Sequence, residues 1–354
     1  MAAGGPRLLD LRSGGWLLLL TALLVLLVGV WLVPPLFRSD GGAIGDGIHV
    51  ESYGFDLRDA LVREIVAAGL PRDGVPSLDH PEIMAAEEVA VFNQAHRGKY
   101  LVSDDRVIGV ELNGERRAYP IRVLNWHEVV NDTLGGVPVA VTYHPLCDSV
   151  VVFDRRVDGE PYVFGVSGLL HNSNLLMYDR SSGPRGESLW SQLQARAIAG
   201  PAAARQTRLN VLPASVARWS HWRERFPDTT VIRPALARLK RYQRNPYGNY
   251  FVTQSPRFPV DPLPPEGSLP LMTRLFILER DGHRWLVPLE GDDLEGSVAL
   301  RDWPDLEVED AGQSASVILA AGPGARSFHS MWFAWYAHHP DGALEDLRRS
   351  RESG

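Results

Sequence analysis

An uninterrupted apolar segment near the N-terminus constrains this chain more than any other feature. Residues 16–33 carry no charge and are mostly Leu and Val. As a helix, this run would be roughly 27 Å long at about 1.5 Å per residue, enough to cross a membrane core. A cleaved signal peptide, whose apolar stretch is usually about 7–15 residues, and a buried core helix are the alternatives. We predict a transmembrane helix over residues 16–33.

The charges around this segment predict its orientation. Arg7 and Arg12 precede it together with Asp10, and Arg38 follows it. Positively charged residues favour the cytoplasmic side of a membrane. Residues 1–15 are therefore predicted to be cytoplasmic. The protein is then a single-pass protein of the cytoplasmic (inner) membrane, with the bulk of the chain extracytoplasmic.

The composition of the whole chain is that of a folded protein. Its 354 residues are 45% hydrophobic and 22% charged, which excludes a disordered or fibrous chain. The net charge of −7 argues against a nucleic-acid partner. Cys147 is the single cysteine, so neither an internal disulfide nor a metal cluster made only of cysteines is possible. No protein partner is predicted.

Composition also divides the chain. Pro34 and Pro35 stop the apolar helix, and four glycines follow before residue 48. Residues 34–55 are therefore predicted to be a Gly/Pro linker. Residues 56–340 form the predicted extracytoplasmic domain, and residues 341–354 a charged tail.

Period-two patterns predict that strands dominate this domain. Two alternating runs flank Asn113-Gly114, which is a hairpin signal, and a second hairpin turns at Asp281-Gly282. The predicted strands or strand-rich segments are residues 106–112, 117–123, 138–143, 149–155, 162–166, 274–289 and 298–320.

Helical periodicity is confined to three segments, residues 56–70, 84–95 and 213–226. Residues 243–270 are rich in proline and predict a long loop, as a lid or a boundary. We see neither regular βαβ alternation nor a Gly-rich phosphate loop. The predicted fold class is α+β: a mainly antiparallel, β-rich domain with flanking helices, preceded by the one transmembrane helix.

Potential metal ligands are concentrated between residues 125 and 178. His144 and Cys147 are three residues apart, with Pro145 between them. This spacing lets a tight turn bring both side chains to one point, as in zinc and redox sites. A thiolate with imidazoles suits copper, zinc or iron. We therefore predict a metal centre, copper before zinc or iron, with ligands His127, His144, Cys147 and His171.

Other roles for these residues stay open. Cys147 could instead be the nucleophile of a metal-independent hydrolase or transferase, or a buried, inert residue of a non-catalytic binding module. His127 could tie down a turn through hydrogen bonds. Glu128 is a possible proton acceptor, so Cys147 and Glu128 are the candidate catalytic residues. No organic cofactor is predicted.

A second dense patch lies near the C-terminus, where residues 328–340 are rich in aromatics and histidines. Its aromatic side chains suit a packed inner strand or a short helix. His338 and His339 are adjacent, so at most one of them is expected to face the metal pocket.

Several motifs together resemble the bacterial and archaeal family known as domain of unknown function 3179. The resemblance runs in order over about residues 56–340 and carries no activity. It implies a secreted or membrane-anchored protein, in agreement with the apolar segment. The matching motifs are RDGVP at residues 72–76, NWHEVVND at 125–132, TYHPLC at 142–147, FDR at 153–155, SGLL at 167–170 and MWFAW at 331–335.

This chain departs from the family pattern at one informative position. The family motif is T-Y-C-P-L-C, and His144 stands here in place of its first cysteine. A dithiol exchange site does not survive that change, whereas a metal site can, because imidazole can replace thiolate as a ligand. The family also tends to carry a basic residue where this chain has His171. His171 could therefore be a metal ligand that this member has gained, or a polar residue of the pocket.

Overall fold

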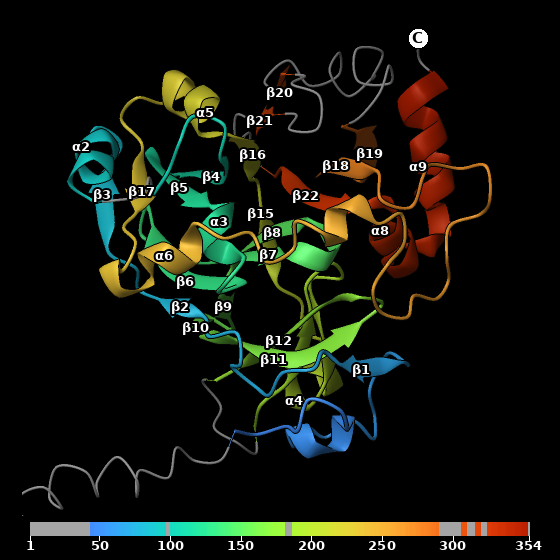
Figure 1. Cartoon of the computed structure of the whole chain (residues 1–354). Coiled ribbons are helices and arrows are strands. Elements are labelled where there is room, and N and C mark those ends of the chain that lie inside the picture. Colours follow the sequence, from blue (N-terminus) through green and yellow to red (C-terminus); the bar gives the residue numbers. More distant parts are fainter. Residues whose placement is uncertain are drawn as a thin grey trace, which may run out of the picture. The chain divides into compact units, whose positions relative to one another are not determined.

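The structure is a computed structural model, and it describes residues 43–96, 100–180, 186–289, 306–309, 316–319 and 324–352 (Figure 1). The predicted transmembrane segment, residues 16–33, lies outside these residues. No helix in the described ranges has both the length and the apolar character needed to cross a membrane.

The Val-rich strands predicted from the sequence form the central sheet. Its strands are all antiparallel neighbours except β2, which runs parallel to β6. β15 (Asn210–Leu212) also pairs with β8. The order is β19 (His283–Pro288), β18 (Arg274–Arg280), β22 (Arg326–Met331), β8 (Ser149–Asp154), β7 (Val137–His144), β6 (Val129–Leu134) and β2 (Leu78–Asp79).

A second sheet covers one face of the central sheet. Val110 of this sheet and Val141 of β7 belong to one apolar core. Gly109 of this sheet lets the Trp222 ring, which follows β16 in the chain, pack closely on it, because a Cβ there would lie 2.3 Å from that ring. The order is β20 (Leu306–Glu309), β21 (Ser316–Leu319), β16 (Ser215–Arg218), β4 (Arg106–Leu112), β5 (Glu115–Pro120), β17 (Thr230–Ile232) and β3 (Ile83–Ala85).

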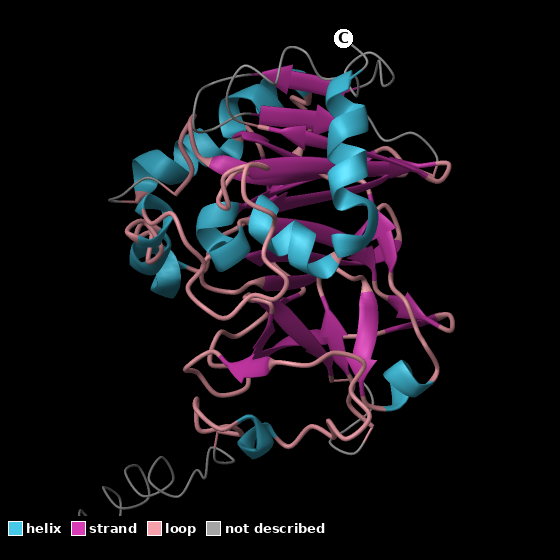
Figure 2. Ribbon diagram, turned by 90° about the vertical axis from the view of Figure 1, so that its right-hand side faces the viewer, coloured by secondary structure: helices cyan, strands magenta, loops and turns pink. Residues whose placement is uncertain are grey.

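A third sheet lies on the other side of the central sheet, at the lower end of the folded domain in Figures 1 and 2. β8 shows why the central sheet is buried on both faces: Val152 faces the first core, and Val151 and Phe153 face a second one. The order of the third sheet is β1 (Ile65–Ala67), β11 (Phe164–His171), β12 (Asn174–Asp179), β13 (Leu189–Ser191) and β14 (Arg196–Ala199). β9 (Arg156–Val157) and β10 (Glu160–Pro161) form a separate ribbon.

Short helices cover the edges of the sheets. The C-terminal pair places Trp332, Trp335 and Leu347 in the second core. The helices are η2 (Val50–Tyr53), α2 (Glu88–Ala95), α3 (Ile121–Leu124), η3 (Pro145–Cys147), α4 (Pro201–Ala204), α5 (Trp219–Arg225), η4 (Leu236–Arg238), α6 (Leu239–Tyr242), η5 (Tyr250–Val252), α8 (Trp332–His338) and α9 (Pro340–Glu352).

The β-rich, mainly antiparallel fold with flanking helices is confirmed, as are both predicted hairpins. The helix predicted over residues 56–70 is wrong. Glu64 has a left-handed φ of 60°, and residues 65–67 form β1 on the edge of β11. Ile65 and Ala67 bury their side chains against Leu169 and its neighbours, so a strand satisfies the apolar positions that suggested a helix.

The helix predicted over residues 213–226 is wrong in its first half. Residues 215–218 form β16, which pairs with β4, and α5 begins only at Trp219. The described end of the predicted linker is also ordered. Tyr53 is fully buried, and its hydroxyl donates to the Leu70 carbonyl oxygen at 2.6 Å. The folded part of the chain therefore begins before residue 56.

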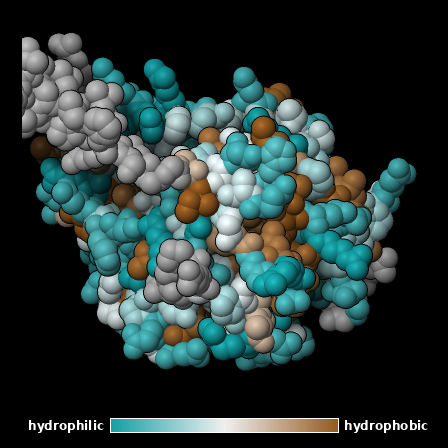
Figure 3. Space-filling view, turned by 90° about the horizontal axis from the view of Figure 1, so that it is seen from below, coloured by the Kyte–Doolittle hydropathy of each residue, from teal (hydrophilic) through white to brown (hydrophobic). Residues whose placement is uncertain are grey.

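Hydrophilic side chains cover most of the face seen in Figure 3, with hydrophobic ones between them in small groups. Large exposed hydrophobic residues include Ile48 and Leu61. Single apolar residues of this kind are ordinary on protein surfaces and identify no docking site.

Candidate active-site pocket

The TYHPLC motif forms a tight turn between two central strands. β7 ends at His144, η3 follows with Pro145 in its first turn, and β8 begins at Ser149. Asp148 closes the turn with a left-handed φ of 43°. His144 and Cys147 are both buried and lie on the same side of this turn, as their shared contact shows.

That shared contact is the tip of the β11–β12 hairpin. Asn172 and Ser173 both have positive φ, as a two-residue turn of the mirror-image type requires. The carbonyl oxygen of Ser173 accepts from His144 Nε2 at 3.1 Å and from the Cys147 thiol at 3.0 Å. The expectation that the H-x-x-C turn brings an imidazole and the thiol together therefore agrees with the structure.

Glu128 lies beside the other nitrogen of the same imidazole. It connects α3 to β6 with a left-handed φ of 55°, which is unusual for a residue with a side chain. It is 5% exposed, and its Oε2 lies 3.4 Å from His144 Nδ1. Hydrogen bonds hold its backbone, with its N–H donating to Leu124 and its carbonyl accepting from Tyr143.

Glu128 and His144 line a pocket of about 270 Å³, which we call the Glu128 pocket. The walls are largely apolar and come from residues near β1, from β11 and β12, and from the loop of residues 243–270. Tyr247 and Arg257 of that loop supply the other polar side chains. The apolar lining residues are Ala68, Leu70, Pro71, Val75, Leu146, Val166, Gly168, Leu169, Leu170, Leu175 and Phe258.

The Glu128 carboxylate affects the pKa of Tyr247, another residue of this pocket. Burial first, and then the nearby Glu128 carboxylate, raises the pKa of the Tyr247 phenol. Tyr247 is therefore a neutral hydrogen-bonding group at physiological pH. Arg257 is exposed at the pocket.

His127 is not among the residues that line this pocket. Its Nδ1 donates to the Pro76 carbonyl oxygen at 2.7 Å, and its Nε2 accepts from the Tyr242 hydroxyl at 2.8 Å. Burial lowers the pKa of His127, so the ring is neutral and both nitrogens are used. The alternative role, tying down a turn, is the one that these contacts support.

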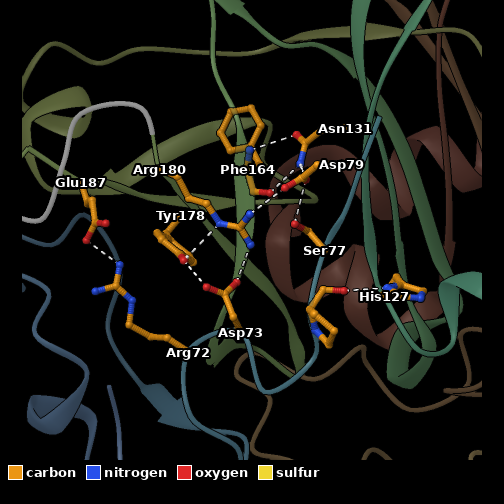
Figure 4. Close-up of polar contacts among 11 residues, drawn as sticks. Arg72, Asp73, Ser77, Asp79, His127, Asn131, Phe164, Tyr178, Arg180 and Glu187 are labelled. Atoms are coloured by element: carbon orange, nitrogen blue, oxygen red, sulfur yellow. Dashed lines mark hydrogen bonds and ion pairs between the residues drawn. The ribbon is translucent and has the colours of Figure 1, made fainter. Parts of the chain in front are cut away.

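The loop that His127 holds is the RDGVP motif, and its charged residues anchor it to the third sheet (Figure 4). Arg180 of the β12 end pairs with Asp73 at 2.7 Å and with Asp79 at 2.9 Å. The Tyr178 hydroxyl also donates to Asp73. These contacts fix the chain that carries Pro71 and Val75, two walls of the Glu128 pocket.

A buried ion cluster supports the turn from the opposite side. The Asp148 carboxylate accepts from Arg106 at 2.9 Å, from Arg274 at 2.6 Å and from the Tyr143 hydroxyl at 2.9 Å. Burial alone would raise the pKa of Asp148, but the two arginines hold it at about 2. Asp148 is thus a charged structural anchor at neutral pH.

The four predicted metal ligands are not gathered at one point. In the ranges that the structure describes, no group of three or more His, Cys, Asp or Glu side chains could hold a metal ion. His127 uses both nitrogens elsewhere. His171 packs against His338, with ring centroids 5.1 Å apart, and burial lowers its pKa to about 4. The predicted metal centre therefore stays a prediction.

Cys147 does not have the surroundings of a nucleophile. It is fully buried, and burial raises the pKa of its thiol. A reactive cysteine has a lowered pKa and access to solvent. The metal-independent nucleophile receives no support from this geometry.

Sequence reasoning missed three groups of the site. The Ser173 carbonyl is a backbone atom, and no sequence pattern marks it. Tyr247 and Arg257 lie in a loop that was recognised only by its proline content. The sequence pointed to these two residues only through the predicted loop of residues 243–270, a lid or a boundary. Residues of that loop form part of the pocket wall.

The fold and the pocket define a β-rich domain with a largely apolar pocket in the part of the chain that the structure describes. Residues 72–302, more than half of the chain, match the family described as "Protein of unknown function (DUF3179)", so the chain belongs to this family. Neither the curated proteins nor the solved structures contain a match. The match is narrower than the expected residues 56–340, and the MWFAW motif lies beyond it.

Proposed function

We propose that the Glu128 pocket is an active site that binds a small organic molecule, and that Glu128 with His144 transfers a proton to or from it. One observation carries this proposal. The Ser173 carbonyl can only accept, so His144 Nε2 must carry a hydrogen. If the ring is neutral, Nδ1 has only a lone pair to offer the Glu128 carboxylate.

A stable contact between Nδ1 and Oε2 therefore needs one more proton. It resides either on the ring, giving an imidazolium–carboxylate pair, or on Glu128 as a carboxylic acid. In both forms the pair holds one transferable proton beside the pocket. The 3.4 Å separation is long for a hydrogen bond, and such contacts often shorten only when a ligand is bound.

The backbone at Glu128 supports a functional role. A left-handed conformation costs a residue with a side chain about 1–2 kcal/mol, which glycine would avoid. The fold retains a glutamate at this position and directs it to the pocket. Strain of this kind is concentrated at active sites.

The lining of the pocket indicates the class of ligand. Its walls are apolar, and at about 270 Å³ it is smaller than a typical site for a drug-sized molecule. Arg257 and the Tyr247 hydroxyl can bind a carboxylate or carbonyl oxygen while Glu128 faces the reacting atom. We infer a small substrate with an apolar body and one such oxygen group.

A fragment screen tests this proposal. Small carboxylic acids and ketones are tested for binding to the purified full chain by saturation-transfer NMR. The variants are Glu128→Gln and Arg257→Gln, with Glu224→Gln, an exposed residue of α5, as the matched control. Fragments that bind the wild type should bind both pocket variants about tenfold more weakly or worse, and the control equally well. Equal binding to all four proteins contradicts the proposal.

The metal centre is a second candidate. It is supported by the meeting of His144 and Cys147 at the Ser173 carbonyl. Elemental analysis of the full chain, purified without a His-rich tag, decides it. This candidate requires stoichiometric copper, zinc or iron that is lost in Cys147→Ala. A wild-type protein without such a metal excludes it.

We also propose the membrane-anchored, extracytoplasmic location that residues 16–33 and their flanking charges indicate. Protease added to intact spheroplasts should degrade a C-terminally tagged chain, while a cytoplasmic marker stays intact. Protection of the tag until the membrane is lysed contradicts this location.

A further inference from the structure

A second cavity, of about 300 Å³, shares no lining residue with the Glu128 pocket. It is lined by the turn between β13 and β14, by β18, β19 and β22, and by the end of α8. We call it the arginine cavity, because four arginines line it. Its charged and imidazole residues are Arg196, Arg208, Glu279, Arg284, Arg326, His338 and His339.

Two of the four arginines are balanced by carboxylates. Arg284 pairs with Glu279 at 2.6 Å and with Asp346 at 3.3 Å. Arg326 pairs with Glu279 at 3.3 Å. The positive charges of these two arginines are therefore balanced by the two carboxylates, Glu279 and Asp346.

The other two arginines face each other. Arg196, which is half-buried, and Arg208, which is exposed, form an isolated antiparallel bridge, and neither forms an ion pair with a carboxylate of the described residues. Arg196 Nε donates to the neutral Gln194 side chain at 3.1 Å. Burial, and then the charge of Arg208, lowers the pKa of Arg196. Like charges directly opposite in a sheet are destabilising, so this pair leaves an uncompensated positive field in the cavity.

The two histidines that line the cavity do not neutralise Arg196 and Arg208. His338 is 5% exposed, and burial lowers its pKa to about 3, so its ring is neutral. Its Nδ1 donates to the Ala334 carbonyl oxygen at 2.8 Å. Its Nε2 has no hydrogen-bond partner among the residues that the structure describes. His339 Nε2 donates to the Leu193 carbonyl oxygen.

We propose that the arginine cavity binds a small oxyanion, a phosphate or carboxylate group, between Arg196 and Arg208. Guanidinium groups bind such anions through paired, charge-assisted hydrogen bonds. The anion would offset the repulsion between the two arginines and would lie in the cavity between the half-buried Arg196 and the exposed Arg208. Anion binding in the arginine cavity does not depend on the role of the Glu128 pocket.

Calorimetric titration of the full chain at low ionic strength tests the proposal. Inorganic phosphate and succinate are titrated separately into the wild type, Arg196→Gln and Arg208→Gln. Arg205→Gln is the matched control, because it removes the same charge from an exposed neighbour outside the cavity. We expect binding to the wild type and the control, and about tenfold weaker binding or worse to the two cavity variants.

The two titrants distinguish the source of the anion. Binding of phosphate alone identifies a phosphoryl ligand, and binding of succinate alone identifies a carboxylate. A thermal melt excludes misfolding, since loss of one repelling arginine should leave the melting temperature of Arg196→Gln unchanged or higher without anion. The proposal is overturned if neither anion binds, or if Arg196→Gln and Arg208→Gln bind as the wild type does.

Discussion

His144 and Cys147 donate hydrogen bonds to one acceptor, the Ser173 carbonyl oxygen, at 3.1 and 3.0 Å. The shared contact couples the β7–β8 turn to the tip of the β11–β12 hairpin. It also fixes the hydrogen on His144 Nε2, which leaves Nδ1 for Glu128. The thiol here is a buried hydrogen-bond donor to the same carbonyl oxygen that binds the imidazole.

The first prediction concerns the reactivity of Cys147. Burial raises the pKa of the thiol, and only the thiolate reacts with alkylating reagents. Iodoacetamide should therefore label the native chain at least about tenfold more slowly than the same chain in guanidinium chloride, as mass spectrometry can measure. Equal rates would restore the nucleophilic cysteine as an explanation.

The second prediction concerns His127. Replacement by Ala leaves the Pro76 carbonyl and the Tyr242 hydroxyl without their partner. The free energy of unfolding should fall by about 2–3 kcal/mol, measured by chemical denaturation. His283→Ala, at an exposed hairpin residue, serves as the control and should change it by less than about 0.5 kcal/mol. A stable His127→Ala protein that loses a bound metal would favour the ligand role instead.

The third prediction concerns acid stability. The arginines beside Asp148 hold its pKa at about 2 against an ordinary value of 3.8. A lowered carboxyl pKa stabilises the fold above the unfolded value, and this contribution is lost as the pH falls. About 2 kcal/mol of unfolding free energy should therefore disappear between about pH 4 and pH 2.

Asp148→Asn tests this origin of the acid sensitivity. The variant should be destabilised at neutral pH by about 3–5 kcal/mol, because two arginines lose their buried partner. It should also lack the contribution that the wild type loses below about pH 4. Asp104→Asn, at an exposed site, is the control. An identical acid profile for Asp148→Asn and the wild type would show that other carboxyl groups cause the loss.

The fourth prediction concerns the strained backbone of Glu128. Glycine adopts its φ of 55° without a Cβ penalty, so Glu128→Gly should raise the free energy of unfolding by about 1 kcal/mol. The same variant should lose binding of the fragments found for the wild type. A gain in stability with loss of binding is the expected signature of a residue kept for function. A destabilised variant that still binds the fragments would contradict this role.

Much of the fold could be predicted from local patterns. The Asn113-Gly114 and Asp281-Gly282 turns and the Val-rich central strands follow from turn chemistry and alternation, which are local properties. The errors arose where tertiary contacts decide. Residues 65–67 and 215–218 became strands because sheet edges at β11 and β4 were available to pair with them.

The candidate site was only partly predictable, for the same reason. The spacing of His144 and Cys147 correctly indicated a common turn. What the two side chains contact there depends on Ser173, a backbone carbonyl from a different sheet. Arg257 enters the pocket from a loop whose path no local pattern specifies.

The proton arrangement at His144 decides whether Glu128 and His144 form a proton-transfer pair. Nitrogen-15 NMR of the full chain with labelled imidazoles, with His144 assigned by loss of its signals in His144→Gln, reports which ring nitrogens carry hydrogen. We expect a protonated Nε2 in the wild type, and an Nδ1 signal that shifts in Glu128→Gln while Nε2 stays protonated. A neutral ring with hydrogen on Nδ1 and a bare Nε2, or an Nδ1 signal unaffected by Glu128→Gln, would contradict it.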